Sequence, residues 1–187
     1  MMSSKRFWII LLVPFFLFTC NQKGKKKEDQ YIVDYNRQVV IKIQKLTNDN
    51  DQAILQDQNV YWGNDSINVQ MLSDYVAQTI FFYFSYNTCP PCIEQSIERL
   101  SQFIPDYQEN DKVVFISPDY LPRLRDDCYG KRLLGLKNKR LGIPLEEENV
   151  PFFFTISKDM KINNLHIVNK TNFNYTTEYL KDLVFKL

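Results

Sequence analysis

The sequence predicts an α/β domain in which helices pack against a central mixed β-sheet. Three observations lead to this fold class. A continuous apolar run at 79–84 is followed by the motif CPPC and then by an amphipathic helical pattern. A second apolar run at 112–117 follows that pattern, as a parallel strand would. The chain then ends in two strand-like runs joined by a turn and a last helical pattern, which adds antiparallel strands.

The N-terminus predicts an export signal. Lys5 and Arg6 precede an apolar run from Phe7 to Phe18, which is shorter than the roughly 20 residues of a membrane span. The run ends at 17–20, Leu-Phe-Thr-Cys, which resembles a bacterial lipoprotein signal. That resemblance implies removal of residues 1–19 and acylation of Cys20, which would anchor the protein to a membrane. A plain signal peptide or an uncleaved anchor is the alternative.

Three further segments follow the signal. Residues 20–30 predict a flexible tether, because NQKGKKKEDQ after Cys20 contains no apolar side chain. Residues 31–59 form an N-terminal extension, in which a helix is expected at 31–48, although VVIKI within it also fits a strand. Its helical spacing is carried by Ile32, Tyr35, Val39, Ile43 and Leu46. The domain itself is expected at 60–187, introduced by a turn at 62–65. The full sequence has a formal net charge of +1, so no basic excess indicates nucleic-acid binding.

The CPPC motif is expected where a buried strand meets a helix. The run at 79–84 has the length and composition of a strand buried on both faces. Beyond Cys92 the apolar side chains recur every three or four residues, on one face of a helix, and Pro91 suits its first turn. A cysteine at the front of a helix lies at the positive end of the helix dipole, which favours the thiolate. We therefore expect Cys89 to be a reactive thiol.

The number of cysteines favours a dithiol over a metal site or a disulfide framework. If Cys20 carries lipid, Cys89, Cys92 and Cys128 remain, which is too few for a framework. Zinc would need two or more further ligands, and only Cys128 and the sole histidine, His166, are available. Copper-delivery sites usually have a wider cysteine spacing. We expect no metal and no cofactor other than a redox-active disulfide between Cys89 and Cys92.

A strand, a CxxC motif with proline before the second cysteine, and a helix resemble the thioredoxin fold. CPPC is similar to the motif of tryparedoxins and of TlpA-like membrane-tethered thiol–disulfide oxidoreductases. The resemblance covers about 60–187. It implies a central mixed sheet flanked by helices, with an N-terminal helical extension and a helical insertion before the cis-proline strand. The implied elements are a parallel strand at 112–117, a hairpin at 152–156 and 162–168, and a closing helix at 176–187. Val150 and Pro151 match the cis-proline segment that binds substrate backbone.

The resemblance also marks departures. Thr88 stands where the family usually has tryptophan, and Tyr83 stands where many thioredoxins have a buried acid. Glu94 is expected to cap the helix, with proton transfer as the lesser alternative. In the insertion, 120–136 predicts a helix in which Cys128 is a small buried side chain. His166 is expected to be structural.

These observations predict an exported, lipid-anchored oxidoreductase of the bacterial cell envelope, facing the periplasm. Cys89 would attack a client disulfide, and Cys92 would then attack Cys89 and release the reduced client. The expected partners are client proteins with disulfides, with apocytochromes among the candidates, and a membrane electron donor. A binding or scaffold lipoprotein with a passive disulfide is the alternative. A peroxide-reducing enzyme ranks third, because the threonine and arginine pattern of peroxiredoxins is not visible around Cys89.

Overall fold

The computed structural model describes residues 30–63, 67–76, 79–118 and 128–185. Contacts divide the chain into two units, Met1–Lys42 and Ile43–Leu187, and the boundary falls within a helix at 30–50. The helix confirms the prediction for 31–48 and excludes the strand alternative. The described part of the first unit, 30–42, exposes several large apolar side chains: Tyr31, Ile32, Val33, Tyr35 and Ile41.

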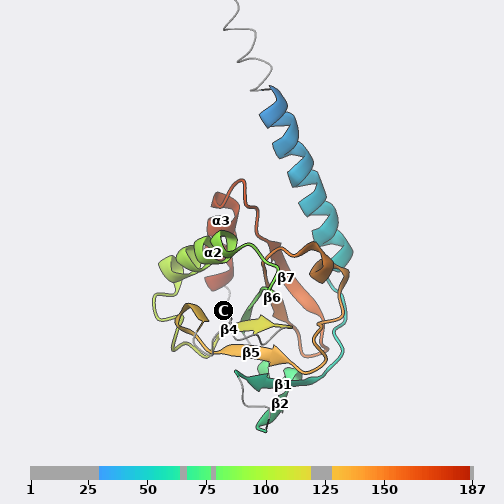
Figure 1. The fold of residues 1–187 in the computed structure, drawn as a ribbon, viewed down its shortest axis with the longest axis vertical. Coiled ribbons are helices and arrows are strands. Elements are labelled where there is room, and N and C mark those ends of the chain that lie inside the picture. Colours follow the sequence, from blue (N-terminus) through green and yellow to red (C-terminus); the bar gives the residue numbers. More distant parts are fainter. Residues whose placement is uncertain (1–29, 64–66, 77–78, 119–127, 186–187) are drawn as a thin grey trace, which may run out of the picture. The chain divides into compact units, whose positions relative to one another are not determined.

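The second unit is built on one open sheet of seven strands (Figure 1). The strands are β1 (Asn59–Trp62), β2 (Val69–Met71), β3 (Ile80–Tyr83), β4 (Val113–Ser117), β5 (Leu133–Leu136), β6 (Phe152–Ile156) and β7 (Ile162–Ile167). Their order across the sheet is β2-β1-β5-β4-β3-β6-β7. The pairs β3–β4 and β4–β5 are parallel, and the other four pairs are antiparallel. The sheet is therefore mixed, as the sequence predicts.

Each face of the sheet carries a hydrophobic core, because successive side chains of a strand point to opposite faces. Phe81 and Tyr83 of β3 belong to the first core, against which Ile43 and Leu46 of the 30–50 helix also pack. Phe82, from the same strand, belongs to the second core. All residues of β3 and β4 are buried, which explains why both strands are continuous apolar runs in the sequence.

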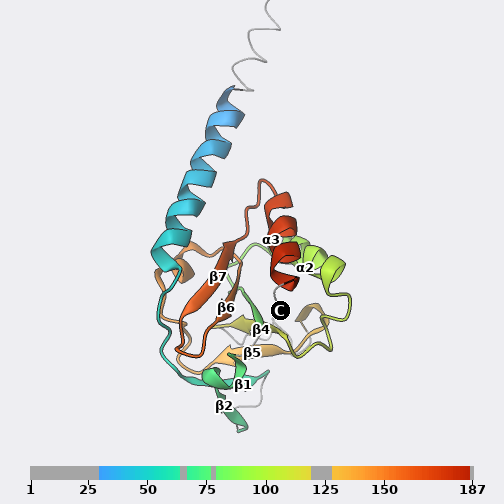
Figure 2. The ribbon, with the colours of Figure 1, turned by 180° about the vertical axis from the view of Figure 1, so that it is seen from behind.

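Two helices cover the second core. The helix α2 (Pro90–Phe103) and the helix α3 (Asn174–Val184) contribute an apolar stripe each, and they lie side by side in both views of the fold (Figures 1 and 2). The buried residues of these stripes include Ile93, Ile97, Leu100, Leu180 and Leu183. Both helices were predicted from this spacing. Within the described residues, no helix combines the length and the apolar character needed to cross a membrane.

The connectivity defines the fold class. The unit β3-α2-β4 is a parallel strand–helix–strand crossover, and β6-β7-α3 is an antiparallel hairpin followed by a helix. The four strands lie in the order β4-β3-β6-β7. This arrangement is the thioredoxin-like fold, and the predictions of the strand at 112–117, the hairpin and the closing helix are confirmed.

The predicted insertion helix at 120–136 is wrong in the part that the structure describes. Residues Cys128–Gly130 form a short 3-10 turn, and Leu133–Leu136 is the strand β5, parallel to β4. Leu133, Leu134 and Leu136 are all buried, and Gly135 leaves room for the Tyr61 ring, which a Cβ atom would meet at 2.6 Å. Residues 119–127 lie outside the described structure.

Candidate redox site

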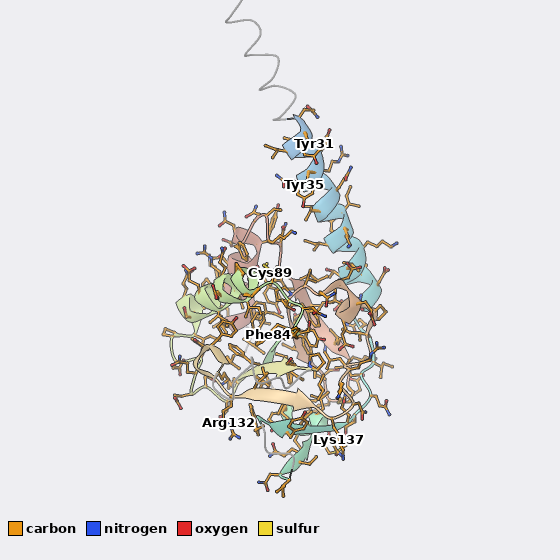
Figure 3. All side chains as sticks on the ribbon, in the orientation of Figure 1. Tyr31, Tyr35, Phe84, Cys89, Arg132 and Lys137 are labelled. Carbon is orange, nitrogen blue, oxygen red and sulfur yellow. The ribbon has the colours of Figure 1, made fainter. Side chains whose placement is uncertain are left out.

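The strand register brings three loops together at one edge of the sheet. Tyr83 of β3 pairs with Phe152 of β6, which pairs with Ile167 of β7. Because β3 and β7 end at this row and β6 begins there, the segments 84–89, 149–151 and 168–173 emerge at the same edge. Cys89 lies here, where the chain enters α2 (Figure 3).

The two cysteines of CPPC differ in environment, as predicted. Both are free thiols, but Cys89 is exposed and Cys92 is buried, with 7% of its surface accessible. Cys89 is the N-cap residue of α2, and its carbonyl accepts hydrogen bonds from the N–H groups of Cys92 (3.0 Å) and Ile93 (3.2 Å). An incoming disulfide can therefore reach Cys89, whereas Cys92 can react only from within the first helical turn.

The two prolines remove hydrogen-bond donors from this helix start. Pro90 and Pro91 are the first two helical residues and have no N–H group. The next amide, that of Cys92, donates to the Cys89 carbonyl. The start of α2 therefore offers a thiolate fewer free N–H groups than a helix that begins without prolines.

The surroundings of Cys92 favour its neutral thiol. Burial, followed by a hydrogen bond with the Cys89 thiol and the charge of Cys89, raises the pKa of Cys92 to about 11. The positive charge of Lys170, in the loop between β7 and α3, acts in the opposite direction and lowers this pKa. Cys92 is thus the protected member of the pair.

Thr88 closes the turn that leads into Cys89. Its side chain is buried, at 2% exposure, and its Oγ1 accepts a hydrogen bond from the Ser85 N–H at 2.9 Å. The Thr88 N–H in turn donates to the Ser85 carbonyl at 3.1 Å, and the two hydroxyls are 3.3 Å apart. Where related proteins usually have tryptophan, this chain therefore has a hydrogen-bonded turn.

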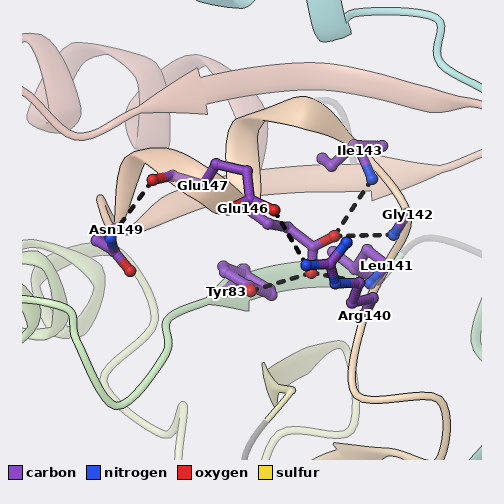
Figure 4. A network of polar contacts seen from close by, with 8 residues as sticks. All are labelled: Tyr83, Arg140, Leu141, Gly142, Ile143, Glu146, Glu147 and Asn149. Atoms are coloured by element: carbon purple, nitrogen blue, oxygen red, sulfur yellow. Dashed lines mark hydrogen bonds and ion pairs between the residues drawn. The ribbon is translucent and has the colours of Figure 1, made fainter.

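Tyr83, at the position expected for a buried acid, is hydrogen-bonded to a half-buried acid, Glu146 (Figure 4). Its hydroxyl donates to Oε1 of Glu146, on a 3-10 helix (Pro144–Glu148) that lies just before Pro151, at 3.1 Å. The same carboxylate accepts the N–H groups of Leu141 (2.9 Å), Gly142 (2.8 Å) and Ile143 (3.2 Å). Glu146 thereby joins the loop before Pro151 to the strand that leads into CPPC.

The predicted substrate segment is at the expected edge, but in another conformation. The peptide bond before Pro151 is trans, as are all those described, so the prediction of a cis bond is wrong; trans is the lower-energy form even before proline. The Pro151 carbonyl accepts the Val168 N–H at 3.0 Å. Among the described residues, no hydrogen bond engages the backbone N–H or carbonyl of Val150.

The remaining predicted residues divide into three groups. Glu94 lies beyond the first turn of α2, because the helix begins at Pro90, so the prediction that it caps the helix is wrong. His166 is structural: its ring stacks on Tyr179 with centroids 4.5 Å apart, and Nε2 is 2.9 Å from Thr176 Oγ1. Cys20 lies outside the described residues, as do the surroundings of Cys128. The described residues contain no group of three His, Cys, Asp or Glu side chains placed to hold a metal ion.

Three residues were not predicted in the roles that the structure gives them: Lys170, Glu146 and Thr88. Lys170 lies in the loop between β7 and α3, and Glu146 lies in the 3-10 helix before Pro151. Nothing in their local sequence indicates their contacts with Cys92 and Tyr83. For Thr88, the spacing Ser85-x-x-Thr88 before a helix was an available signal, because short hydroxyl side chains often close such turns.

Comparisons with known proteins found similar solved structures, but no match to a family model or to a curated protein. Among solved structures, a thioredoxin-like protein from Porphyromonas gingivalis matches with 16% identity and a TM-score of 0.46, over 73% of this chain and 95% of that one.

Two further solved structures match with similar sequence identity and TM-score. A provisionally named thiol:disulfide interchange protein, DsbE, from Chlorobium tepidum has 14% identity and a TM-score of 0.44, over 72% of this chain and 99% of its own. ScoI from Arabidopsis thaliana with copper bound has 13% identity and a TM-score of 0.42, and the match covers 72% of this chain and 100% of that one. At TM-scores this low, the assignment of a thioredoxin-like fold rests on the strand order and connectivity of the chain itself.

Proposed function

We propose that this protein is a thiol–disulfide oxidoreductase that reduces disulfide bonds of client proteins through Cys89 and Cys92. The observation that carries the proposal is the asymmetry of the pair at the start of α2: an exposed Cys89 and a buried Cys92. Two-step thiol exchange needs one accessible thiol that attacks first and one protected thiol that attacks second.

In the first step, the Cys89 thiolate attacks one sulfur of the client disulfide. The S–S bond of the client breaks, a mixed disulfide forms at Cys89, and the first client sulfur leaves as a thiolate that takes up a proton. In the second step, Cys92 loses its proton and attacks the Cys89 sulfur. The client leaves with both sulfurs reduced, and its two electrons come from the dithiol, which becomes the Cys89–Cys92 disulfide.

The N–H and carbonyl of Val150 make no hydrogen bond among the described residues. This supports the segment as a binding site for the client backbone. An extended client segment can pair with that N–H and carbonyl, as in strand addition. Pro151 holds the segment against β7 through its bond to Val168. Client disulfides, apocytochromes among them, and a membrane electron donor that reduces the pair again are the partners that this reaction requires.

The test is disulfide reduction by the purified protein and its variants. Cys89→Ser should abolish reduction, and Cys92→Ser should accumulate a mixed disulfide at Cys89. Cys128→Ser, which removes a thiol outside the motif, should retain activity. A pair that stays oxidised in dithiothreitol, or activity that survives Cys89→Ser, would instead indicate a binding protein with a passive disulfide.

We also propose that the protein is attached to the cell envelope through a lipid on Cys20. Support comes from the basic start, the apolar run and the cysteine that ends it. In the native cell, wild-type protein should partition into detergent, and Cys20→Ser should remain unprocessed or become soluble. A soluble wild-type protein with a free Cys20 thiol would reject the anchor.

A further inference from the structure

We propose that Lys170 is part of the redox site: its ammonium group favours the thiolate of Cys92 in the step that releases the client. The inference deepens the proposed function and rests on it for the identity of the client. It assigns a role in this step to a residue on the loop between β7 and α3, more than 70 positions away in the chain.

The fold holds Lys170 at the dithiol edge of the sheet. Ile167 ends β7 in the same row as Tyr83 and Phe152, and the next residue, Val168, donates its N–H to the Pro151 carbonyl at 3.0 Å. Lys170 follows two positions later. Its loop therefore starts at the same edge of the sheet as the end of β3, from which the chain runs into CPPC, with the start of β6 between them.

The loop has a defined shape, which presents Lys170 outward. Asn169 is buried, at 3% exposure, and its Oδ1 accepts hydrogen bonds from the Thr171 N–H (2.9 Å) and the Thr171 hydroxyl (2.7 Å). The Asn172 N–H donates to the Asn169 carbonyl at 3.0 Å. Asn169 thus fixes the turn from inside, while the side chain of Lys170 is exposed and its charge acts on the Cys92 thiol.

Few other charges are placed to assist Cys92. The segment 149–151 contributes Asn149, Val150 and Pro151, none of which is ionisable, and 85–88 contributes only Tyr86. On α2 itself, Glu94 is exposed and carries the opposite charge to Lys170. Among the described residues, the titratable groups that act on the Cys92 thiol are Cys89 and Lys170, and of these two Lys170 favours the thiolate.

The chemistry of the second step makes this charge important. Once Cys89 is joined to the client, its sulfur has no proton and no charge, so its two contributions to the raised pKa of Cys92 disappear. Burial, which opposes the thiolate, and the Cys92 amide and Lys170, which favour it, remain. Because Pro90 and Pro91 remove two amide donors from this helix start, Lys170 is the cationic support that the described part of the chain offers when Cys92 must lose its proton.

The experiment follows this step without a client. The full-length protein carries Cys20→Ser and Cys128→Ser in all samples, so that the thiols of the pair alone react. Dithiodipyridine, a neutral disulfide, reacts with Cys89 of this reduced protein and releases one thiopyridone. Attack by Cys92 on the resulting mixed disulfide releases the second. The rate of the second release, measured by stopped flow from neutral to alkaline pH, reports the availability of the Cys92 thiolate.

Lys170→Met should slow the second release about three-fold or more at neutral pH and move its pH profile to higher pH. The rate falls because less of Cys92 is ionised when the positive charge is lost, and the loss is partly offset because a more basic thiolate is a better nucleophile. Lys170→Arg should restore the rate. Lys158→Met, with the same charge change in an exposed turn at the opposite end of the β6–β7 hairpin, is the matched control and should match wild type.

The outcomes separate the two proposals. Equal rates and pH profiles for Lys170→Met and Lys158→Met would overturn the role of Lys170, whatever the clients are. A slower second release in Lys170→Met, together with no reduction of any protein disulfide, would support the role of Lys170 and reject the proposed function. High salt should reduce the difference between Lys170→Met and wild type, because the effect is electrostatic and the lysine is exposed.

Discussion

At the scale of single residues, position 88 shows how this chain shapes the turn that leads to the exposed thiol of Cys89. Tryptophan at that position would fill space by its size, whereas Thr88 acts through one hydroxyl that caps the Ser85 N–H. The sequence predicted that Cys89 is exposed and Cys92 is shielded, because both properties follow from the position of each thiol relative to a helix start. It could not predict the partner of Tyr83, because Glu146 lies 63 residues further along the chain.

We expect Thr88→Val to destabilise the protein by about 1–3 kcal/mol, because the buried Ser85 N–H loses its acceptor while the shape of the side chain is kept. Thr88→Ser retains the oxygen and should lose less. The free energy of unfolding in urea measures both. A Thr88→Val protein as stable as Thr88→Ser would contradict the role of the hydroxyl and leave only packing.

At the scale of elements, the strands and helices that carry the site follow from local pattern, and the error lies where two patterns compete. Leu133-Leu134-Gly135-Leu136 fits a buried strand as well as a helix by composition alone. The neighbouring strands decide between them, because β5 fills the gap between β1 and β4 and Gly135 accommodates the Tyr61 ring. The short strands β1 and β2 depend on the same pairing, so the sequence could not indicate them either.

The 3-10 helix before Pro151 is held by one carboxylate, which gives an element-scale prediction. Glu146→Gln replaces one accepting oxygen with an amide NH₂ group that would face N–H donors, so we expect a loss of about 1–3 kcal/mol in the free energy of unfolding. The neighbouring Glu147→Gln is the matched control. Its ion pair with Arg140 is 72% exposed on both sides, so its loss should cost less than about 1 kcal/mol.

Urea unfolding of the two glutamine variants distinguishes a loop anchor from an ordinary surface acid. Glu146→Gln should also slow reaction of the Cys89–Cys92 pair with protein clients more than with dithiodipyridine, because the Val150–Pro151 segment would be less well placed for a client strand. Equal stability of Glu146→Gln and Glu147→Gln would contradict the anchor.

At the scale of the whole molecule, the sequence predicted the sheet class and the position of the dithiol at its edge. The reason is that a thioredoxin-like fold places its helix-capping cysteine by the local order of strand, turn and helix, which is visible in 79–103. The positions of two charged side chains were not predictable in the same way. Lys170 reaches the dithiol edge only after β6 has paired with β3 and β7 with β6. Glu146 reaches Tyr83 across 63 residues of chain, so local sequence indicates neither contact.

His166 connects this packing to the pH dependence of global stability. Burial beside Tyr179 lowers its pKa from 6.5 to about 4, so the folded protein keeps the ring neutral where the unfolded chain would protonate it. Because the unfolded state binds more protons between these two values, stability is complete above about pH 7 and falls as the pH decreases toward 4. We expect a loss of about 1 kcal/mol between pH 7.5 and pH 5.5.

His166 is the sole histidine, so few other side chains titrate in that window. The measurement is the free energy of unfolding in urea at several pH values, for wild type and for His166→Gln. The variant should be less stable at neutral pH, because it loses the stacking on Tyr179, but its stability should change little between pH 7.5 and pH 5.5. A wild-type protein whose stability is flat across this window, or a His166→Gln protein with the same slope, would show that the ring protonates equally easily in both states. The packing of β7 against α3 would then not exclude water from His166 as the structure indicates.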